Sequence, residues 1–254
     1  MPDGAPSQPS SLVRELEERA FNAWPALQTL LCGGWVIRLS EGYTKRANSI
    51  NAWQPAHSLP DILAHAGPIY AARGLPCIVR LTPLASPGDD AFLAARGFTA
   101  ADETLVMTAA LSAQPRPADP SIVVEHVPAP AWLDGFAAAN AVPAGRRAVH
   151  DRMVGNVPPP AAFARLEQDG RTLAWGLAVV ERGMAGLFDI VTLPGARRQG
   201  LGRRLVEGLL AWSGEQGASQ AYLQVVAANE PAIALYRRLG FTEAYRYHYR
   251  IEPR

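Results

Sequence analysis

Residues 189–205, DIVTLPGARRQGLGRRL, constrain the fold most, because an apolar strand runs into a glycine-containing turn that opens a helix. Glycine lets the backbone approach a ligand closely and point N–H groups toward it. The helix N-terminus adds partial positive charge, and Arg197, Arg198, Arg203 and Arg204 add full charges. The segment therefore predicts a pyrophosphate site in an α/β chain.

Three other interpretations of this loop compete on its own residues. A Rossmann dinucleotide loop needs a third glycine three residues after Gly202, where Leu205 stands. A Walker A loop needs Gly-Lys-Ser/Thr, which this segment lacks. The third possibility is an arginine-rich helix start that binds nothing.

A second motif, NEPAIALYRRLGF at residues 229–241, follows the loop by about 30 residues. Arg-x-x-Gly-x-Gly at 197–202 followed by Asn-x-x-Ala-x-x-Leu-Tyr-x-x-Leu-Gly-Phe resembles the GNAT acetyltransferases. The resemblance covers roughly residues 122–254. It implies an acetyl-CoA-binding domain.

The resemblance also implies roles for individual residues. Backbone groups of Ile190, Val191 and Thr192 would hold the pantetheine amides, and residues 197–203 would wrap the pyrophosphate. Tyr236 would be the general acid that protonates the departing thiolate, with packing on an amphipathic helix as the alternative. The implied cofactor set is Ile190, Val191, Thr192, Arg197, Arg198, Gln199, Gly200, Leu201, Gly202, Arg203, Asn229 and Tyr236.

The expected reaction is direct attack of a primary amine on the acetyl carbonyl, with a backbone N–H near Val191 or Thr192 stabilising the oxyanion. The general base is less obvious. Ribosomal-protein N-terminal acetyltransferases, which the chain resembles, carry glutamate at the position of Gln224, and an amide cannot serve as a base. Asp189 is the first substitute and Glu181 the second, although either acid could be a surface group; a water chain is the third option.

The two halves of the chain look related. A shift of 143 residues places Gly74 on Gly217 and Gly97 on Gly240, each at the end of an expected helix. The functional positions are lost in the first half, where they fall on Gln54, His57, Leu59, Ser86 and Leu93. We therefore expect an α/β fold of the α+β type, with two GNAT-like units that are each a mixed, mostly antiparallel sheet flanked by helices.

The expected domains are a disordered tail at 1–10, a degenerate GNAT-like domain at 11–110, a proline-rich linker at 111–121 and the acetyl-CoA-binding GNAT domain at 122–254. In the first half we expect helices at 12–31, interrupted or turned near Trp24-Pro25, at 61–73 and at 89–96, and strands at 35–39, 47–53, 77–81 and 104–110. In the second half we expect helices at 131–139, 202–216 and 231–239, and strands at 122–127, 163–168, 173–181, 186–192, 221–226 and 244–251, with a loop or helix around 146–152. The polar segment 41–49, with Asn22 and Trp24, is a candidate acceptor region or simply a surface hairpin.

Composition narrows the function classes. A net charge of +1 offers no electrostatic support for a nucleic-acid partner. Two cysteines and scattered histidines predict no disulfide framework and no metal site. Without a signal peptide or a long apolar stretch, the expectation is a soluble cytoplasmic protein with no membrane partner.

The leading hypothesis is acetyl transfer to a small-molecule amine or amino acid; the alternatives are a non-catalytic acyl-CoA sensor or scaffold, or a protein N-terminal or lysine acetyltransferase. The oligomeric state stays open.

Overall fold

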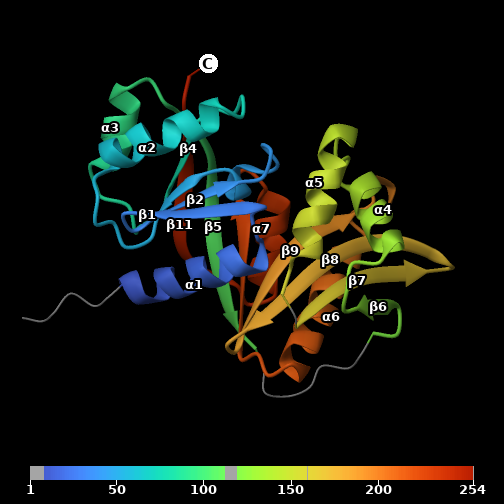
Figure 1. Cartoon of the computed structure of the whole chain (residues 1–254). Helices are drawn as coiled ribbons and strands as arrows, with labels where there is room; N and C mark the ends of the chain where they lie inside the picture. Colours follow the sequence, from blue (N-terminus) through green and yellow to red (C-terminus); the bar gives the residue numbers. More distant parts are fainter. Residues whose placement is uncertain (1–8, 112–118, 159, 254) are drawn as a thin grey trace, which may run out of the picture. The chain divides into compact units, whose positions relative to one another are not determined.

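The computed structural model describes residues 9–111, 119–158 and 160–253, and these divide into two compact units (Figure 1). Unit 1 holds residues up to 21, 26–105 and 244–254, and unit 2 holds 22–25 and 106–243. This division differs from the expected boundaries, because each unit takes its last strand from the other half of the chain. Most of the expected tail at 1–10 and linker at 111–121 lies outside the described residues.

Unit 1 places strands in the order β1-β2-β3-β4-β11, followed by the first part of β5. Its helices and strands are α1 (Pro9–Ala23), β1 (Gln28–Cys32), β2 (Trp35–Leu39), β3 (Ile50–Ala52), α2 (Leu59–Ala71), β4 (Ile78–Leu81), α3 (Asp89–Ala95), β5 (Thr99–Ala110) and β11 (Thr242–Ile251), with a 3-10 turn at Lys45–Ala47. β3 and β4 run parallel, whereas β1–β2, β2–β3 and β4–β11 are antiparallel.

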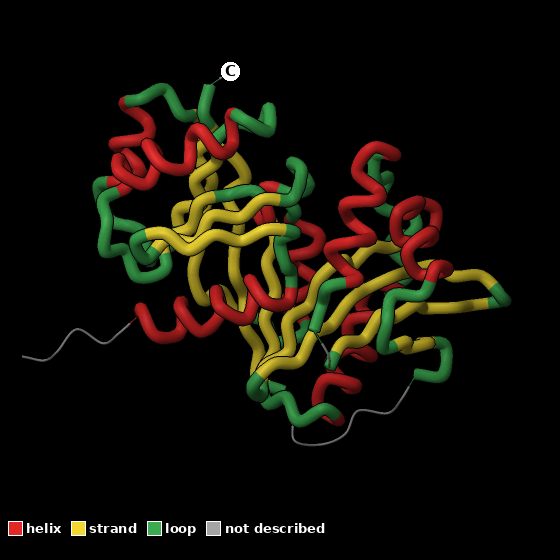
Figure 2. Tube along the Cα trace, viewed as in Figure 1, coloured by secondary structure: helices red, strands yellow, loops and turns green. Residues whose placement is uncertain are grey.

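The two faces of the unit 1 sheet differ in chemistry. Alternate residues such as Ile37 and Val79 join a hydrophobic core with α2 and α3. The intervening Arg38 and Arg80 are fully buried on the opposite face, where Glu17 of α1 pairs with Arg80. Figure 2 shows α1 on the other side of these strands from α2 and α3. A sheet with one apolar and one buried polar face results.

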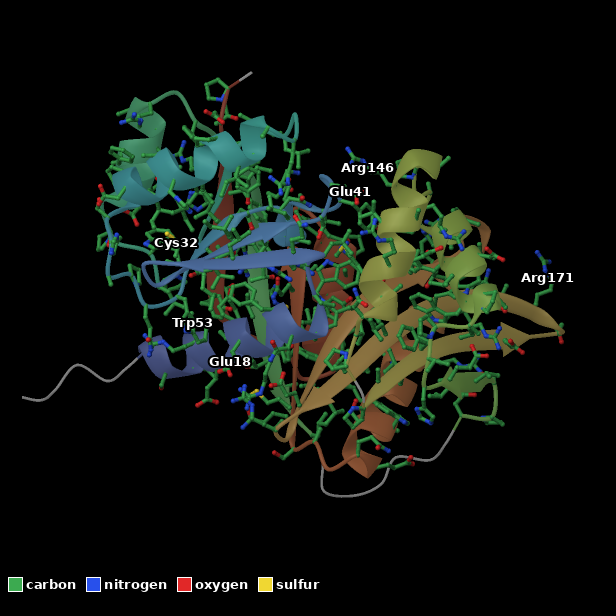
Figure 3. The ribbon with its side chains drawn as sticks, viewed as in Figure 1. Glu18, Cys32, Glu41, Trp53, Arg146 and Arg171 are labelled. Carbon is green, nitrogen blue, oxygen red and sulfur yellow. The ribbon has the colours of Figure 1, made fainter. Side chains whose placement is uncertain are left out.

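Unit 2 continues from the last part of β5 in the order β10-β9-β8-β7-β6. Its elements are β6 (Ile122–Glu125), α4 (Pro130–Ala139), α5 (Ala144–Gly155), β7 (Ala161–Gln168), β8 (Arg171–Glu181), β9 (Met184–Thr192), a 3-10 turn at Pro194–Ala196, α6 (Leu201–Glu215), β10 (Gln220–Val226) and α7 (Glu230–Arg238). The expected β7–β8 hairpin turns at Asp169-Gly170, next to Arg171 at its tip (Figure 3).

Helices cover both faces of the unit 2 sheet. Gly176 has no side chain, so Leu205 and Leu209 of α6 pack directly over β8; a Cβ there would lie 2.9 Å from Leu209 Cδ1. The neighbouring residue, Trp175, faces the opposite side, where its ring packs on Gly135 of α4. β9 and β10 are parallel and the pairs β6–β7, β7–β8 and β8–β9 are antiparallel, which repeats the pattern of unit 1. The expectation of two mixed, mostly antiparallel α/β units is confirmed.

Some expected elements are wrong in detail. The helix expected at 12–31 ends at Ala23, beside the expected interruption at Trp24-Pro25, but it does not resume after the break, and residues 28–32 form β1 instead. Gly33 and Gly34, with φ of 53° and 81°, make the two-residue turn that joins β1 to β2. The strand expected at 47–53 is only Ile50–Ala52, and the one expected from 104 starts at Thr99.

Candidate functional site

The parallel strands β9 and β10 part at their carboxyl ends. Their pairing runs from Met184 opposite Gln220 to Leu187 opposite Leu223, whereas the strands themselves continue to Thr192 and Val226. The carboxyl ends of neighbouring parallel strands are the usual position of a ligand site in an α/β sheet. The expected pantetheine strand, residues 190–192, lies in this part of β9, which pairs with β8 but extends beyond the pairing with β10.

A β-bulge distinguishes this end of β9. Trp175 faces Val191 and Leu177 faces Phe188, so β9 has one residue more than β8 across this interval. The extra residue changes the direction of the strand, and Asp189 has a φ of 51° at this point. Bulges of this kind redirect side chains and backbone groups beside functional sites.

The expected phosphate loop leaves β9 and leads into α6. Arg198 and Gly200 have φ values of 62° and 78°, and the loop residues 197–200 are exposed. Alternation of left-handed and other conformations forms a concave row of N–H groups that suits an anion. Among the described residues, no side chain caps the N-terminus of α6, so its first N–H groups face outward without a helical partner.

The arginines of this segment are in different surroundings. Arg197 and Arg198 are exposed, and Arg203 forms an ion pair with Glu207 at 3.0 Å on the surface of α6. Arg204 instead donates from Nε to Asp119 Oδ2 at 2.9 Å and from an NH₂ group to Ser121 Oγ at 2.7 Å. Arg204 was expected to add a charge to the loop, but these bonds commit its guanidinium to the segment before β6.

The second motif lies at the same end of the sheet as the loop, because α7 follows β10 as α6 follows β9. A Cβ on Gly202 would lie 3.4 Å from Thr192 Oγ1 and 3.8 Å from Leu235 Cδ2, which brings the loop, β9 and α7 together. Asn229 caps α7, accepting a hydrogen bond from Ala232 N at 3.3 Å. Its carboxamide NH₂ group is the part that can contact a ligand.

Tyr236 is buried on α7, where its ring lies edge-on to Phe241 at a centroid distance of 5.9 Å. Burial raises the pKa of the Tyr236 phenol to about 12. The phenol is therefore protonated throughout the neutral range and has a proton to donate.

Asp189 has a partner that the sequence did not predict. His150 of α5 is completely buried, and its Nε2 lies 3.2 Å from Asp189 Oδ2. Its Nδ1 lies 3.1 Å from Asp151 Oδ1. Burial lowers the pKa of His150, but the hydrogen bonds and charges of Asp189 and Asp151 outweigh burial and raise it above its ordinary value. His150 and Asp189 are 39 residues apart, so no spacing motif links them.

The remaining candidates have simpler surroundings. Glu181, the second candidate base, accepts hydrogen bonds from Asn22 Nδ2 at 3.1 Å and pairs with Arg182. Trp24 stacks on Phe188 with ring centroids 6.1 Å apart. Gln224 is half-buried on β10, one residue beyond the part of that strand that pairs with β9.

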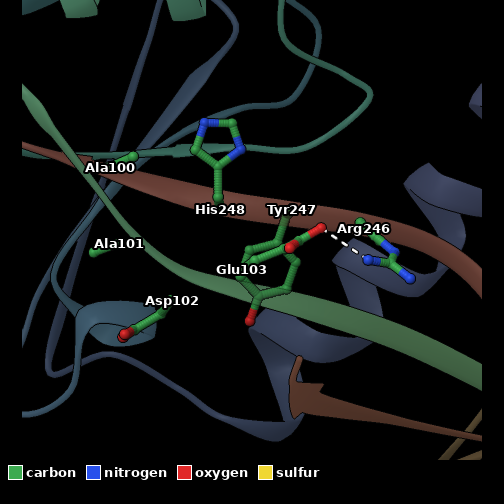
Figure 4. Close-up of a pocket in the computed structure, with 7 residues that line it drawn as sticks. All are labelled: Ala100, Ala101, Asp102, Glu103, Arg246, Tyr247 and His248. Atoms are coloured by element: carbon green, nitrogen blue, oxygen red, sulfur yellow. Dashed lines mark hydrogen bonds and ion pairs between the residues drawn. The ribbon is translucent and has the colours of Figure 1, made fainter. Parts of the chain in front are cut away.

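The polar segment 41–49 binds largely to itself. Asn48 Oδ1 accepts from the backbone of Ser40 and Gly42 at 2.7 and 2.9 Å, and Lys45 pairs with Asp102. Asn48 and Ser49 are buried, with 3% and 0% exposure, and the role of the segment towards an acceptor stays a prediction. Unit 1 also contains a cavity of about 410 Å³ (Figure 4). It is lined by Ala100, Ala101, Asp102, Glu103, Arg246, Tyr247 and His248, none of them a predicted site residue.

The described residues contain no group of three or more His, Cys, Asp and Glu side chains placed to hold a metal ion. They also contain no helix long and apolar enough to cross a membrane.

The family described as "Probable histone acetyltransferase Rv0428c C-terminal" matches residues 10–250. An uncharacterized N-acetyltransferase, YobR of Bacillus subtilis, is 30% identical over 246 residues, covering 94% of this chain and 98% of that protein. The chain belongs to the GNAT acetyltransferases. The expectation drawn from its two motifs is therefore confirmed at the level of family and enzyme class.

Solved structures agree with this acetyltransferase fold. A GCN5-related N-acetyltransferase from Kribbella flavida superposes with a TM-score of 0.69 at 18% identity, covering 96% of this chain and 97% of that one. A tandem GNAT protein from the clavulanic acid biosynthesis pathway superposes with a TM-score of 0.61 at 14% identity, covering 98% and 89%. The Escherichia coli [ribosomal protein bS18]-alanine N-acetyltransferase is 42% identical over 80 residues, which are 32% of this chain and 54% of that enzyme.

Proposed function

We propose that this acetyltransferase uses acetyl-CoA to acetylate a primary amine of a small molecule or amino acid, with the cofactor bound by unit 2. The observation that carries the proposal is the convergence at one end of the sheet. Three elements meet there: the start of α6 without a side-chain cap, the end of β9 beyond its pairing with β10, and the helix that bears Tyr236. Each is a feature that a CoA thioester requires, and unit 2 supplies all three.

The residues fit the cofactor chemically. The positive-φ turn and the first N–H groups of α6 suit the pyrophosphate, and exposed Arg197 and Arg198 add charge. Residues 190–192 have no β10 partner on the edge of β9 that faces away from β8, and this edge can pair with the pantetheine amides as a strand would. Gly202 adds no side chain to this region, where Thr192 and Leu235 lie within 4 Å of where its Cβ would be. When bound, acetyl-CoA supplies an activated acetyl group.

Two side chains supply proton transfer. Tyr236 donates its phenolic proton to the leaving thiolate; burial, which raises its pKa to about 12, keeps the phenol protonated before transfer. Asp189 accepts the proton of the attacking amine, since it is the carboxylate at the bulge next to the cofactor strand. Asp189 thus takes the role of general base, for which ribosomal-protein N-terminal acetyltransferases carry a glutamate at the position of Gln224.

The test is thiol release from acetyl-CoA with a panel of amino acids, polyamines, aminoglycosides and peptides. We expect one class of acceptor to raise thiol release well above hydrolysis. Tyr236→Phe should lower kcat by about 10²-fold or more while leaving CoA affinity unchanged in calorimetry. Tyr245→Phe, in unit 1, is the matched control. CoA binding without turnover on any acceptor would instead favour the sensor or scaffold alternative.

Acetylation of a protein N-terminus is the second candidate, and the 80-residue similarity to the bS18-alanine enzyme favours it. Peptides beginning with alanine, with and without a blocked N-terminus, distinguish it from small-amine transfer. Peptide turnover exceeding that of every free amine would replace the proposed acceptor class but keep the cofactor site.

A further inference from the structure

Unit 1 contains a second cavity, which is smaller than the one in Figure 4 and lies where α2 meets one end of the unit 1 sheet. Its residues come from α2 and from the ends of three strands: Cys77 precedes β4, Phe98 precedes β5 and Glu252 follows β11. Its volume is about 220 Å³. Pockets for drug-sized ligands start at roughly 300 Å³, so this cavity suits a smaller molecule.

The inner part of this cavity is apolar. Cys77 and Phe98 are 1% and 8% exposed, and both belong to the hydrophobic core of unit 1. Leu63 and Ala64 of α2 also line the cavity, and Leu63 packs against the same core. Gly67 lines it without filling it, because glycine has no side chain. A small aliphatic group can therefore be buried here.

Two charged side chains at the cavity are held in place by other contacts. Glu252 Oε2 accepts a hydrogen bond from Cys77 N at 3.1 Å, and Glu252 N donates to Cys77 O at 2.9 Å. The Arg96 guanidinium lies over the Phe92 ring, 5.0 Å from its centroid. Among the described residues, neither Arg96 nor Glu252 has an ion-pair partner within 4.0 Å. The cavity thus offers a guanidinium and a carboxylate oxygen that are positioned but not neutralised.

The charged groups of the larger cavity in Figure 4 are bound differently. Asp102 pairs with Lys45 at 2.7 Å, and Glu103 pairs with Arg246 at 2.9 Å. A charged ligand would have to displace one of these partners, and it would break one ion pair for each that it forms. The smaller cavity requires no such exchange, so it is the better candidate for a charged ligand.

The chemistry of the smaller cavity matches a zwitterion with an apolar side chain. A carboxylate and a guanidinium form parallel charge-assisted hydrogen bonds, and an ammonium group donates to a carboxylate oxygen with similar strength. Both protein groups are preorganised, which reduces the entropy lost on binding. The apolar inner part of the cavity accommodates an aliphatic side chain.

We propose that this cavity binds a free aliphatic amino acid of about the size of leucine. Its carboxylate pairs with Arg96 and its ammonium group with Glu252. Its side chain lies against Leu63 and Phe98. The residues proposed to hold acetyl-CoA all belong to unit 2, so the amino acid site is independent of the proposed function. Unit 1, which lost the cofactor motif, thereby has a ligand of its own.

Four ligands test this chemistry in NMR titrations of the protein without acetyl-CoA. Leucine should bind with a Kd below about 1 mM. Isocaproate lacks the ammonium group of leucine and isoamylamine lacks its carboxylate, so each should bind at least about 10-fold more weakly. Glycine lacks the side chain and should also bind at least about 10-fold more weakly. If isocaproate binds as tightly as leucine, the cavity is a monocarboxylate site and the amino acid assignment is wrong.

Variants of the two charged residues locate the ligand. Arg96→Gln and Glu252→Gln should each weaken leucine binding by about 10-fold. In Arg96→Gln the ligand carboxylate has no partner, so leucine and isoamylamine should bind with nearly equal affinity. Arg73→Gln removes another exposed arginine of unit 1, which does not line the cavity, and is the matched control. Its affinity for leucine should equal that of the wild type.

A steric block tests the cavity itself. Ala64→Phe should fill the cavity with a ring and abolish leucine binding. Ala71→Phe, two turns further along the same face of α2, should leave leucine binding unchanged. Both alanines are exposed, so neither change should disturb the core, and denaturant titrations check the folding of each variant.

Leucine belongs to the class of amines proposed as acceptors for unit 2, so its binding position decides the outcome. If leucine binding is unchanged in both Arg96→Gln and Ala64→Phe, the ligand is bound elsewhere and the inference is wrong. It is also wrong if leucine does not bind up to about 10 mM. Failure of the proposed function looks different: leucine binds at the cavity, but no acceptor raises thiol release from acetyl-CoA. In that case the amino acid site stands.

Discussion

Equivalent helix starts in the two units have opposite chemistry. In unit 1, α2 begins after Ser58, whose hydroxyl accepts a hydrogen bond from Asp61 N at 3.5 Å, and the Asp61 carboxylate lies in the first turn. In unit 2, α6 begins after Gly200 and has no acid in its first turn. Its third helical residue is Arg203, whereas the third helical residue of α2 is Asp61. The first helix satisfies and neutralises its own N-terminus, whereas the second leaves it for an anion. The duplicated fold thus keeps its scaffold in both copies, whereas the helix start proposed to bind the cofactor is present in one.

The loops that precede these helices differ in the same way. In unit 1, backbone N–H groups of residues 53, 54, 56 and 57 donate to the carbonyls of Gly33 and Gly34 at 2.9–3.2 Å. A Cβ on Gly34 would lie 1.8 Å from Gln54 O, so the hairpin turn fills the space directly. The backbone N–H groups that would bind a phosphate at this place therefore already donate to carbonyls of the β1–β2 turn.

Unit 1 uses its polar residues for packing between α1 and the sheet. Glu17 receives two guanidinium donors from Arg80 and the hydroxyl of Tyr245, and Arg80 stacks over the Tyr247 ring at 3.7 Å. Both members of the Glu17–Arg80 pair are 1% exposed. A second buried cation on this face, Arg38, has its pKa lowered to about 9 by burial and by repulsion from Arg80 and Arg46.

The largest expected effect is therefore on the stability of unit 1. Glu17→Ala or Arg80→Ala leaves a buried charge without its partner, and each should lower the free energy of unfolding by about 3–5 kcal/mol in denaturant titrations. Replacing both residues with methionine should cost less than either single change, because no lone charge remains. Single variants that unfold like the wild type would show that this face is not the structural layer described here.

The second prediction makes α6 resemble α2. Arg203→Asp places a carboxylate where unit 1 has Asp61, so CoA affinity measured by calorimetry should fall at least about 10-fold, with a larger difference at low salt. Stability should stay within about 1 kcal/mol, because an acid is favourable at a helix N-terminus even though the Glu207 pair is lost. Arg171→Asp at the hairpin tip is the matched charge control (Figure 3). Equal loss of affinity in both variants would point to a general charge effect and not to the helix start.

Much of the duplication could be predicted from the sequence, because a glycine at a helix end indicates a left-handed backbone conformation. Gly74 and Gly217 have φ values of 63° and 84°, as that conformation requires. The exchange of last strands was not predictable. β5 and β11 have ordinary strand patterns, and the pairing partners of a strand are set by tertiary packing and not by its own residues.

The same distinction applies to the candidate site. The loop and α7 are contiguous motifs, so the sequence alone predicts their residues. His150 contacts Asp189 only through folding of α5 against the sheet, and the RRAVHDR segment around it resembles any charged helix. Arg204 resembles its neighbours in sequence, but its place one residue beyond Arg203 on α6 directs it to Asp119.

The third prediction tests the duplicated helix ends. Gly74→Ala and Gly217→Ala should each cost about 1–2 kcal/mol, since neither Cβ would meet an atom within 4 Å and only the left-handed backbone resists. Gly67→Ala in α2 and Gly214→Ala in α6 have the same open space but no positive φ, and should stabilise by up to about 1 kcal/mol. Unequal costs at 74 and 217 in denaturant titrations would argue against equivalent roles for the two ends.

The smallest effects concern one surface carboxylate in each unit. Hydrogen bonds from Arg250 and His248 lower the pKa of Asp90 in unit 1 to about 2, and hydrogen bonds from Arg204 and Ser121 lower that of Asp119 in unit 2 to about 2. Because both folded pKa values lie below the ordinary 3.8, each contribution to stability is complete above that value and is lost as pH falls through about 2.

Asp90→Asn and Asp119→Asn should accordingly each lower stability by less than about 1 kcal/mol at neutral pH, and the difference from wild type should vanish in acid. Asp119 should show the larger loss, because its side chain is 25% exposed against 46% for Asp90 and is screened less by water and salt. Free energies of unfolding measured from pH 2 to 7 at two salt concentrations give both comparisons. A deficit that grows as the pH falls would have the wrong sign for an ionised carboxylate partner, and would assign the two residues to packing instead of charge pairing.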